Sequence, residues 1–362
     1  MNSVRSQLSS INYRFLRRLI IMQQSLLKKD LEGAIIVGDK INHLLMNSPF
    51  KHLFKFSIPN NIGTYLYNLN FPSPIIAASF KDDISALLQW QFVGIGGITY
   101  KTVLKNPSEG NKRPRIQEVS YNGSYALLNS LGLPTKGVDN FVNHFEHEQL
   151  LSFNRPIGIS IGGDSVADYV QVFESINSKV ESSPFDQFFY EINISCPNTE
   201  DGKCLSDDLN QLAFLLTKMR SLSSKVIVVK TSPDSNDNEI LKICEILSSL
   251  DKSAINVGNT RYVSVESVGL KPNHFSKPGG GLSGPPLFDS TLERVKLINS
   301  NFKIPIIATG GIGNYDQVKA IIDNGARLIG MASRLVIDPF IIPQINNKLS
   351  HEEILIYQRH ES

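Results

Sequence analysis

Residues 304–331 read IPIIATGGIGNYDQVKAIIDNGARLIGM. A short apolar run ends at Thr309, a glycine-rich turn follows, and a longer amphipathic stretch leads to a second apolar run ending at Met331. Asn314 can cap the start of a helix over the amphipathic stretch, and Gly325 suits its end. The segment therefore predicts one strand–helix–strand unit, the building block of a parallel sheet.

The same alternation recurs along the chain from residue 74. The apolar runs are Pro74–Ala78, Phe92–Gly97, Pro156–Ile161, Phe188–Ile194, Val226–Lys230, Ala254–Val257, Ile304–Thr309 and Arg327–Met331. The helices expected between them are Asp82–Trp90, Ser165–Asn177 with Asp164 as its N-cap, Asp207–Arg220, Asn238–Leu250, Thr291–Ser300 and Tyr315–Asn324. Short Ile- and Val-rich runs without strict alternation are typical of parallel strands covered on both faces. Eight such strands favour an α/β fold of the (β/α)8 TIM-barrel type, over residues 71–350, rather than an open doubly wound sheet.

Composition and charge narrow the class of protein. The chain has 362 residues, of which 41% are hydrophobic and 19% charged, as in an ordinary globular protein. Its 36 basic and 34 acidic residues give a net charge of +2, so we expect no nucleic-acid partner. The three cysteines, Cys196, Cys204 and Cys244, are too few for a disulfide framework and lack zinc-site spacing. We therefore expect no metal site and a reducing compartment, the cytoplasm.

Residues 1–70 are predicted to form a helical N-terminal extension. Residues 1–29 contain six basic residues and no acidic one, with apolar residues such as Phe15 and Leu19 at helical spacing. This pattern fits an amphipathic helix on an anionic membrane, and equally a removable organellar transit segment. A helix packed on the barrel is the third alternative, and the sequence leaves all three open. No run approaches the ~18 uninterrupted apolar residues of a membrane-spanning helix.

Polar residues follow many of the predicted strands. Active sites of such barrels are built at the carboxyl ends of the strands. The residues at these ends are Ser79, Thr99 to Lys101, Ser160, Asn193 to Asn198, Lys230, Asn259, Thr260, Gly310, Gly311 and Ser333. A buried Asn193 or Lys230 needs a polar partner, either a ligand or neighbouring backbone. Residues 100–155 and 258–288 are long, loop-rich insertions, where we expect substrate contacts.

Two kinds of segment carry chemistry. The first, Glu191–Thr199, places Cys196 between Asn193 and Asn198 just after a strand. A lone cysteine is more often an inert packing group, but the flanking amides favour a reactive role here. The second kind comprises the glycine-rich turns 279–284 and 309–313, whose backbone N–H groups are suited to a phosphate.

Five motifs together resemble the dihydroorotate dehydrogenase family. They are Asn-Ile-Ser-Cys-Pro-Asn (193–198), Gly-Asn-Lys-Arg-Pro-Arg (110–115), Asn-Ser-Leu-Gly-Leu-Pro (129–134), Gly-Gly-Leu-Ser-Gly (280–284) and Thr-Gly-Gly-Ile (309–312). The resemblance runs from about residue 60 to about residue 348 and keeps the order of the family. It implies oxidation of dihydroorotate to orotate by hydride transfer to FMN, in pyrimidine (UMP) biosynthesis.

The resemblance also implies a role for individual residues. Cys196 matches the base that removes the C5 proton of the substrate, and Lys101 matches a catalytic lysine that reaches both substrate and flavin. The substrate-binding positions that match are Lys101, Asn129, Gly132, Leu133, Asn193, Asn198, Asn259 and Thr260. The FMN-binding positions that match are Ala78, Ser79, Asn193, Lys230, Gly284, Gly310, Gly311, Ala332 and Ser333. Lys230 matches the cation beside flavin N1 and O2, where reduction deposits negative charge.

The electron acceptor is not fixed by the resemblance. The family has a soluble class with a Cys base and a membrane-associated, quinone-reducing class with a Ser base and a helical extension. Cys196, Lys101 and Leu133–Pro134 resemble the soluble class, whereas residues 1–70 and Lys230–Asp234 resemble the quinone class. We expect quinone as acceptor, at a peripheral membrane position, with fumarate or an NAD-linked partner as alternatives. The oligomeric state stays open.

Three other functions compete with this interpretation. Another FMN barrel reductase acting on a pyrimidine would share the barrel and a loop cysteine, but the asparagine ring and the lack of iron–sulfur cysteine clusters favour dihydroorotate. An enzyme acting on tRNA would need a basic face, which the near-neutral charge does not offer. A barrel kept only for binding would be expected to lose Lys230, Cys196 or the phosphate glycines, and all are present.

Overall fold

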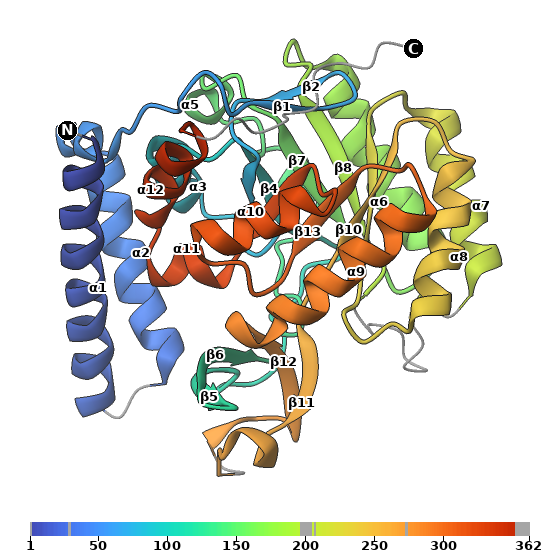
Figure 1. The fold of residues 1–362 in the computed structure, drawn as a ribbon. Helices are drawn as coiled ribbons and strands as arrows, with labels where there is room; N and C mark the ends of the chain where they lie inside the picture. The colour runs from blue at the N-terminus through green and yellow to red at the C-terminus, as the bar shows by residue number, and fades with distance from the viewer. Residues whose placement is uncertain (1, 28–29, 196–204, 206–207, 272–273, 352–362) are drawn as a thin grey trace.

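A closed eight-stranded barrel forms the centre of the computed structural model, which describes residues 2–27, 30–195, 205, 208–271 and 274–351 (Figure 1). Its strands are β3 (Ile75–Ala77), β4 (Gly97–Val103), β7 (Ile157–Ile161), β8 (Phe188–Asn193), β9 (Ile227–Thr231), β10 (Ser253–Val257), β13 (Ile306–Thr309) and β14 (Leu328–Met331). Each strand pairs in parallel with the next, and β14 pairs with β3 to close the ring. The predicted (β/α)8 barrel is confirmed.

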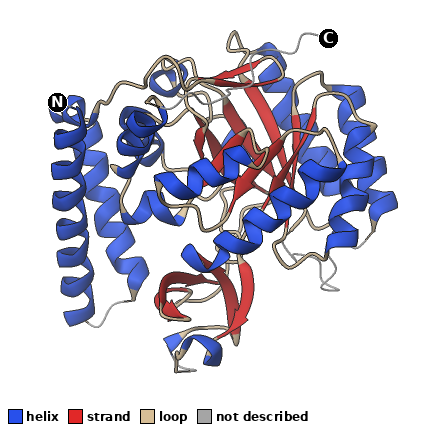
Figure 2. Ribbon diagram, in the orientation of Figure 1, coloured by secondary structure: helices blue, strands red, loops and turns tan. Residues whose placement is uncertain are grey.

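Helices surround the strands on the outside (Figure 2). The longer ones are α3 (Ile84–Val93), α6 (Val166–Ser182), α7 (Leu209–Leu222), α8 (Asp237–Ser248), α9 (Phe288–Asn301) and α10 (Tyr315–Asp323). The shorter ones are α4 (Val138–Val142), α5 (Glu148–Leu151), α11 (Ser333–Ile337) and α12 (Ile341–Leu349). Apolar side chains on the helices and on the outer face of the strands form the largest hydrophobic core.

One predicted strand is wrong. The run Phe92–Gly97 is not a strand, because α3 continues to Val93 and β4 begins only at Gly97. Gly94 ends the helix with a φ of 97°, a left-handed conformation that glycine adopts without strain. The end of the helix and the start of the strand are both buried and apolar, so hydrophobicity alone could not separate them.

Of the two predicted helix N-caps, one is confirmed and one is wrong. Asn314 caps α10 as predicted, and its side chain accepts the backbone N–H of Gln317. The cap of α6 is Ser165 rather than the predicted Asp164, since the Ser165 hydroxyl accepts the N–H of Asp168. Both residue types cap helices well, and the backbone turn before the helix decides which side chain reaches the first turn.

The interior of the barrel is apolar at the amino ends of the strands. Residues from six strands, including Phe189, Val228 and Ile307, pack into a core separate from the outer one. The hairpin of β1 (Thr64–Leu66) and β2 (Leu69–Phe71) adds Leu66, Leu69 and Phe71 to this inner core. The hairpin therefore closes the amino end of the barrel, and the opposite end is left for function.

The two long insertions fold together, which the expectation of loops missed. They contribute β5 (Ile116–Tyr121), β6 (Ser124–Asn129), β11 (Arg261–Ser264) and β12 (Gly279–Ser283) to one antiparallel sheet, in the order β11-β12-β6-β5. Each insertion supplies one antiparallel pair, β5 with β6 and β11 with β12, and the pairing of β12 with β6 joins the two pairs into one sheet. The sheet lies beyond the carboxyl ends of the barrel strands (Figure 1).

The N-terminal extension is a helical hairpin against the side of the barrel. It consists of α1 (Asn2–Leu26) and α2 (Leu31–Met46), followed by the 3-10 helix η1 (Pro49–Phe54) (Figure 1). The Ser10 hydroxyl donates to the buried carboxylate of Asp338 at 2.5 Å, and Arg17 bonds to Glu118 of β5. No helix in the described part of the chain is long and apolar enough to cross a membrane.

Ion pairs fasten the start of α2 to the insertion. Arg115 Nη2 and Nε donate to Glu32 at 2.8 and 3.0 Å, and Arg113 Nε donates to Asp30 at 2.9 Å. Hydrogen bonding from Arg113 holds the pKa of Asp30 below its usual value of 3.8. Because the folded pKa is the lower one, this pair stabilises docking at neutral pH and loses its effect only as the pH falls below that value.

We predict that Glu32→Arg loosens the hairpin without unfolding the barrel. The new cation would face Arg113 and Arg115, so the docked state loses attraction and gains repulsion. We expect amide hydrogen exchange in the hairpin to accelerate about tenfold, equivalent to ~1.4 kcal/mol. Hydrogen exchange read by mass spectrometry measures this, with the exposed Glu293→Arg on α9 as control. Unchanged exchange in the hairpin would contradict the fastening role.

Candidate active site

Polar side chains replace the apolar core at the carboxyl end of the barrel interior. Successive residues of a strand point to opposite faces, so Glu191 and Asn193 share the inward face of Phe189. By the same alternation Lys230 follows Val228 inward on β9, and Asn256 follows Ala254 on β10. A layer of buried polar groups therefore covers the inner apolar core, called the apolar plug below. It lies at the end where such barrels place their chemistry.

Lys230 and Glu191 form the centre of one hydrogen-bonded network. Lys230 Nζ donates to Ser79 Oγ at 3.1 Å, and the Ser79 hydroxyl in turn donates to Glu191 Oε1. Asn256 Nδ2 donates to the other carboxylate oxygen at 2.7 Å. The Lys230 ammonium lies 3.9 Å from Glu191, and the two residues are only 5% and 2% exposed. The sequence predicted Ser79 and Lys230 together at this site, and the structure places them in contact.

A second network connects the predicted substrate ligands. Asn193 Nδ2 donates to Thr102 Oγ1 at 3.0 Å, and its Oδ1 accepts the Ser195 hydroxyl at 2.8 Å. Asn259 Nδ2 donates to Ser195 Oγ at 2.6 Å, while Asn259 Oδ1 accepts the backbone N–H of Thr260. Residues from β8 and from the loop after β10 are thus joined directly before position 196. Cys196 and Asn198 themselves lie outside the described residues.

Lys101 and the segment 129–134 lie on the other side of the barrel mouth. Lys101 Nζ donates to the carbonyl of Pro134 at 2.6 Å, so the predicted lysine contacts the predicted substrate segment. Burial lowers the pKa of Lys101, against a smaller opposing effect of Asp82. Asn129 is the last residue of β6, and its Nδ2 donates to the carbonyl of Gly281 on the neighbouring β12 at 3.2 Å, so the segment 129–134 leaves directly from the insertion sheet.

The turn at Gly132 and Leu133 is held in an uncommon backbone conformation. Both residues have positive φ, 70° and 47°, and for the leucine this costs strain that the surroundings must offset. Asn111 bonds to the carbonyls of Ser130 and Leu131, at 2.8 and 2.9 Å, and a Cβ at Gly132 would collide with it. The motif 110–115, which sequence reasoning left without a role, therefore supports the predicted substrate turn.

The predicted phosphate glycines converge after the last two strands. Gly310 and Gly311 have φ of 139° and 72°, and a Cβ on Gly311 would come within 2.3 Å of the Phe288 nitrogen at the start of α9. Gly284 of the insertion lies close to the end of β14, since a Cβ on this glycine would lie 4.0 Å from Ser333 Oγ. Ala332 is the N-cap of α11, directly before Ser333. Glycine-rich turns beside a helix start are suited to bind an anion through their backbone N–H groups.

The residues present fit a flavin phosphate and ring. Gly310 and Gly311 form a turn of positive φ directly after β13, the kind of turn that binds a phosphate through backbone N–H groups. The buried Lys230 contacts Ser79, and its charge is suited to a ring that becomes anionic on reduction. Within the described residues, the buried atoms Asn256 Oδ1 and Thr309 Oγ1 have no hydrogen-bond partner. Unpaired buried polar atoms are costly, and ones at the floor of a mouth are suited to a bound group.

Sequence reasoning missed several residues of the site. Glu191 and Asn256 were given no role, although each is a polar residue inside an apolar run, the feature that pointed to Asn193 and Lys230. Applying that criterion to every strand would have found both. Cys244 is a buried free thiol whose burial raises its pKa to about 12, so its thiol is unreactive at neutral pH.

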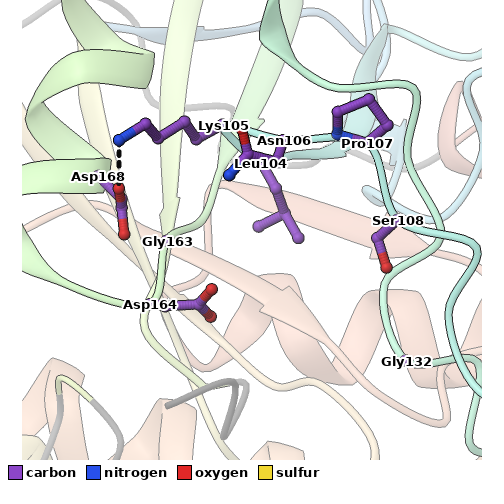
Figure 3. Close-up of a pocket in the computed structure, with 9 residues that line it drawn as sticks. All are labelled: Leu104, Lys105, Asn106, Pro107, Ser108, Gly132, Gly163, Asp164 and Asp168. Carbon is purple, nitrogen blue, oxygen red and sulfur yellow. Dashed lines mark ion pairs between the residues drawn. The ribbon is translucent and has the colours of Figure 1, made fainter. Parts of the chain in front are cut away.

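A cavity of about 270 Å³ lies next to the turn at Gly132 (Figure 3). Its described lining comes from the segment 104–108 after β4, from Gly163 and Asp164 after β7, and from Gly132. Lys105 points across it toward Asp168 at the start of α6, and the two form an ion pair of 3.1 Å. Among the described lining residues only Gly132 belongs to the predicted substrate set. The cavity therefore borders the predicted substrate site and does not coincide with it.

A family model described as dihydroorotate dehydrogenase matches residues 62–352. The chain belongs to the dihydroorotate dehydrogenase family. The catalytic subunit of dihydroorotate dehydrogenase B (NAD(+)) from Malacoplasma penetrans is 30% identical over 296 residues, 80% of this chain and 92% of that protein. Dihydroorotate dehydrogenase (quinone) from Wigglesworthia glossinidia brevipalpis is 29% identical over 320 residues, 85% and 93% of the two chains.

The fold agrees with this family. The crystal structure of the Eimeria tenella enzyme DHODH, in complex with ferulenol, superimposes with a TM-score of 0.67 over 87% of this chain and 90% of that one, at 20% identity. Dihydroorotate dehydrogenases oxidise dihydroorotate to orotate in pyrimidine biosynthesis and depend on FMN, and family membership gives this chain that activity and cofactor. The predicted family, fold, reaction and cofactor are thereby confirmed.

We predict that Gly310→Asp removes FMN from this dihydroorotate dehydrogenase. The side chain would collide with Thr291, whose Oγ1 lies 2.5 Å from the new Cβ, and its charge would repel a phosphate. We expect the purified variant to lack flavin absorbance near 450 nm, on the order of a hundredfold weaker binding. Gly38→Asp on α2 is the control, because nothing lies within 4 Å of its Cβ. Stoichiometric FMN in Gly310→Asp would refute the cradle.

Proposed function

We propose that Cys196 is the base that removes the C5 proton of (S)-dihydroorotate. Bound FMN supplies the hydride acceptor for C6. Asn129, Asn193, Asn198, Asn259 and Thr260 would bind the carboxylate and amides of the substrate, while Gly132 and Leu133 contribute backbone groups. The observation that carries the proposal is the network from Asn259 through Ser195 to Asn193, which fixes the chain directly before Cys196.

Two lysines complete the proposed mechanism. Lys101, held by the Pro134 carbonyl, would orient the substrate against the flavin, and burial already lowers its pKa. Lys230 would hold its charge beside the pyrimidine edge of the flavin, with no need for reorganisation during the reaction. Ala78, Ser79, Gly284, Gly310, Gly311, Ala332 and Ser333 would hold the cofactor, largely through backbone groups.

We predict that Cys196→Ala slows reduction of the bound flavin by dihydroorotate about 10²- to 10⁴-fold, the usual contribution of a positioned base. Rapid mixing without an electron acceptor measures this step alone. Cys196→Ser should keep weak activity that rises toward higher pH, because a hydroxyl is harder to deprotonate than a thiol. A parental rate in Cys196→Ala would show that another group removes the proton.

For the electron acceptor we propose a quinone, reached at a membrane surface. Six exposed apolar residues of α1, the α1 apolar face, recur every three, four or seven residues along one side of the helix: Val4, Leu8, Ile11, Phe15, Met22 and Leu26. Arg14 and Arg17, on another side of α1, are already engaged by Asp338 and Glu118. An apolar stripe on a basic helix is suited to the interface of an anionic bilayer.

The relatives do not decide between acceptors. Both an NAD(+) catalytic subunit and a quinone enzyme match most of the chain, with nearly equal identity. The match to the family model begins at residue 62, so α1 and α2 lie outside it. The hairpin is therefore the part of the chain that argues for a membrane, and a protein partner that covers the same face is the alternative outcome.

We predict that the double variant Phe15→Glu/Met22→Glu loses both membrane binding and quinone turnover. Each buried apolar side chain contributes ~1.5–3 kcal/mol, so we expect binding to anionic phospholipid vesicles to weaken at least tenfold. Vesicle sedimentation and quinone-dependent orotate formation measure the two effects. Reduction of the flavin by dihydroorotate should stay at the parental rate, since the changes lie on the outer face of α1.

The control and the opposing results separate the alternatives. Phe214→Glu on α7 is matched, because Phe214 is 64% exposed and Phe15 is 63% exposed. The surface variant is sharper than deletion of residues 1–60, which would also remove the carboxylates that bind Arg113 and Arg115. Equal quinone turnover in the double variant would refute the membrane role. Turnover with fumarate or NAD in an acceptor screen, and none with quinone, would reassign the acceptor.

A further inference from the structure

A carboxylate is buried in the barrel interior without a role in the reaction described above. Glu191 lies on β8, between the apolar plug and the mouth, and it is 2% exposed. An isolated buried carboxylate is unfavourable by several kcal/mol, so its surroundings must compensate its charge. Both of its oxygens accept hydrogen bonds, one from Ser79 and one from Asn256.

The direction of every hydrogen bond around Glu191 is fixed. Lys230 can only donate, so the Ser79 oxygen accepts from it and the Ser79 proton must point to Glu191. Asn256 also donates its N–H. The orientation of Asn256 follows from the carboxylate, which can only accept, and among the described residues Asn256 Oδ1 is left without a hydrogen-bond partner. A carboxamide at position 191 would remove the negative charge and keep one oxygen that can accept from Ser79.

We propose that Glu191 is a positioning residue that fixes Lys230 and partly compensates its charge, and thereby sets the relative affinity for oxidised and reduced FMN. The inference rests on the proposed placement of FMN beside Lys230. The Glu191 carboxylate lies 3.9 Å from the Lys230 ammonium and is joined to it through a single hydroxyl. At this distance, inside a barrel, a charge acts far more strongly than in water.

The sign of the effect follows from electrostatics. Reduction of the flavin would place negative charge beside Lys230, whose ammonium the Glu191 carboxylate holds through Ser79 and whose charge it partly compensates. Removal of the carboxylate charge leaves Lys230 uncompensated, so the reduced flavin binds more tightly relative to the oxidised form. We therefore expect Glu191→Gln to raise the midpoint potential of the flavin, and Lys230→Met to lower it.

The experiment compares the FMN-loaded parent, Glu191→Gln, Lys230→Met and the double variant. Redox titration with reference dyes gives the midpoint potential, and fluorescence titration gives the Kd for oxidised FMN. For Glu191→Gln we expect the ratio of reduced to oxidised affinity to rise about tenfold, which is ~30 mV for a two-electron couple. In the Lys230→Met background, Glu191→Gln should change this affinity ratio at most a few-fold, because the group through which Glu191 acts is absent.

The outcomes separate this inference from the placement of the cofactor. No change of potential or FMN affinity in Lys230→Met would show that the proposed placement is wrong. A clear shift in Lys230→Met with none in Glu191→Gln would overturn the role of Glu191 alone. An equal shift in both backgrounds would show that Glu191 acts independently of Lys230, which also overturns it. The control is Glu181→Gln on α6, the same substitution at an exposed carboxylate, which should leave the potential unchanged.

A stability measurement keeps the proposal testable if Glu191→Gln fails to fold. Loss of one partner of a buried pair leaves a charge uncompensated, whereas loss of both partners removes the problem. We expect Glu191→Gln to lower the yield of soluble protein or its melting temperature, and Lys230→Met in addition to restore it. Recovery in the double variant supports the pairing. If Glu191→Gln and the double variant lose yield or melting temperature equally, the pairing is overturned.

Discussion

The buried ammonium of Lys230 is the constraint around which the carboxyl end of the barrel interior is arranged. A lysine 5% exposed requires polar partners, and these are Ser79, two residues after β3, and the Glu191 carboxylate of β8. The carboxylate in turn requires donors, and Asn256 from β10 is one. Strands that are distant in the sequence are therefore held in register by charge as well as by the apolar plug below.

The substrate side of the mouth depends on contacts that begin far from it. Arg115 binds Glu32 of α2 with one end of its guanidinium and the carbonyls of Glu109 and Asn111 with the other. Asn111 then supports the turn that contains Gly132 and Leu133. The N-terminal hairpin is thus connected to the proposed substrate turn through a short series of polar contacts, beside the insertion sheet.

The sequence predicted the elements better than their limits. Seven of the eight apolar runs coincide with barrel strands to within two residues, because a buried parallel strand has to be apolar on both faces. The run Phe92–Gly97 failed, since the end of a buried helix is equally apolar and only Gly94 marks the boundary. The hairpin of β5 and β6 could have been predicted, because Asn122 and Gly123 form a two-residue turn between its strands. Only the pairing of β12 with β6 spans more than 130 residues, and no local pattern records that pairing.

By itself the sequence determined the barrel and the reaction class and supplied the candidate site residues, because strand periodicity and short motifs are local properties. Only the tertiary structure decided which polar side chains meet. Glu191 and Lys230 are 39 positions apart, and their contact exists only because β8 and β9 are neighbours in a closed ring. The partners of buried charges are set by strand order and register, which the chain acquires only when it folds.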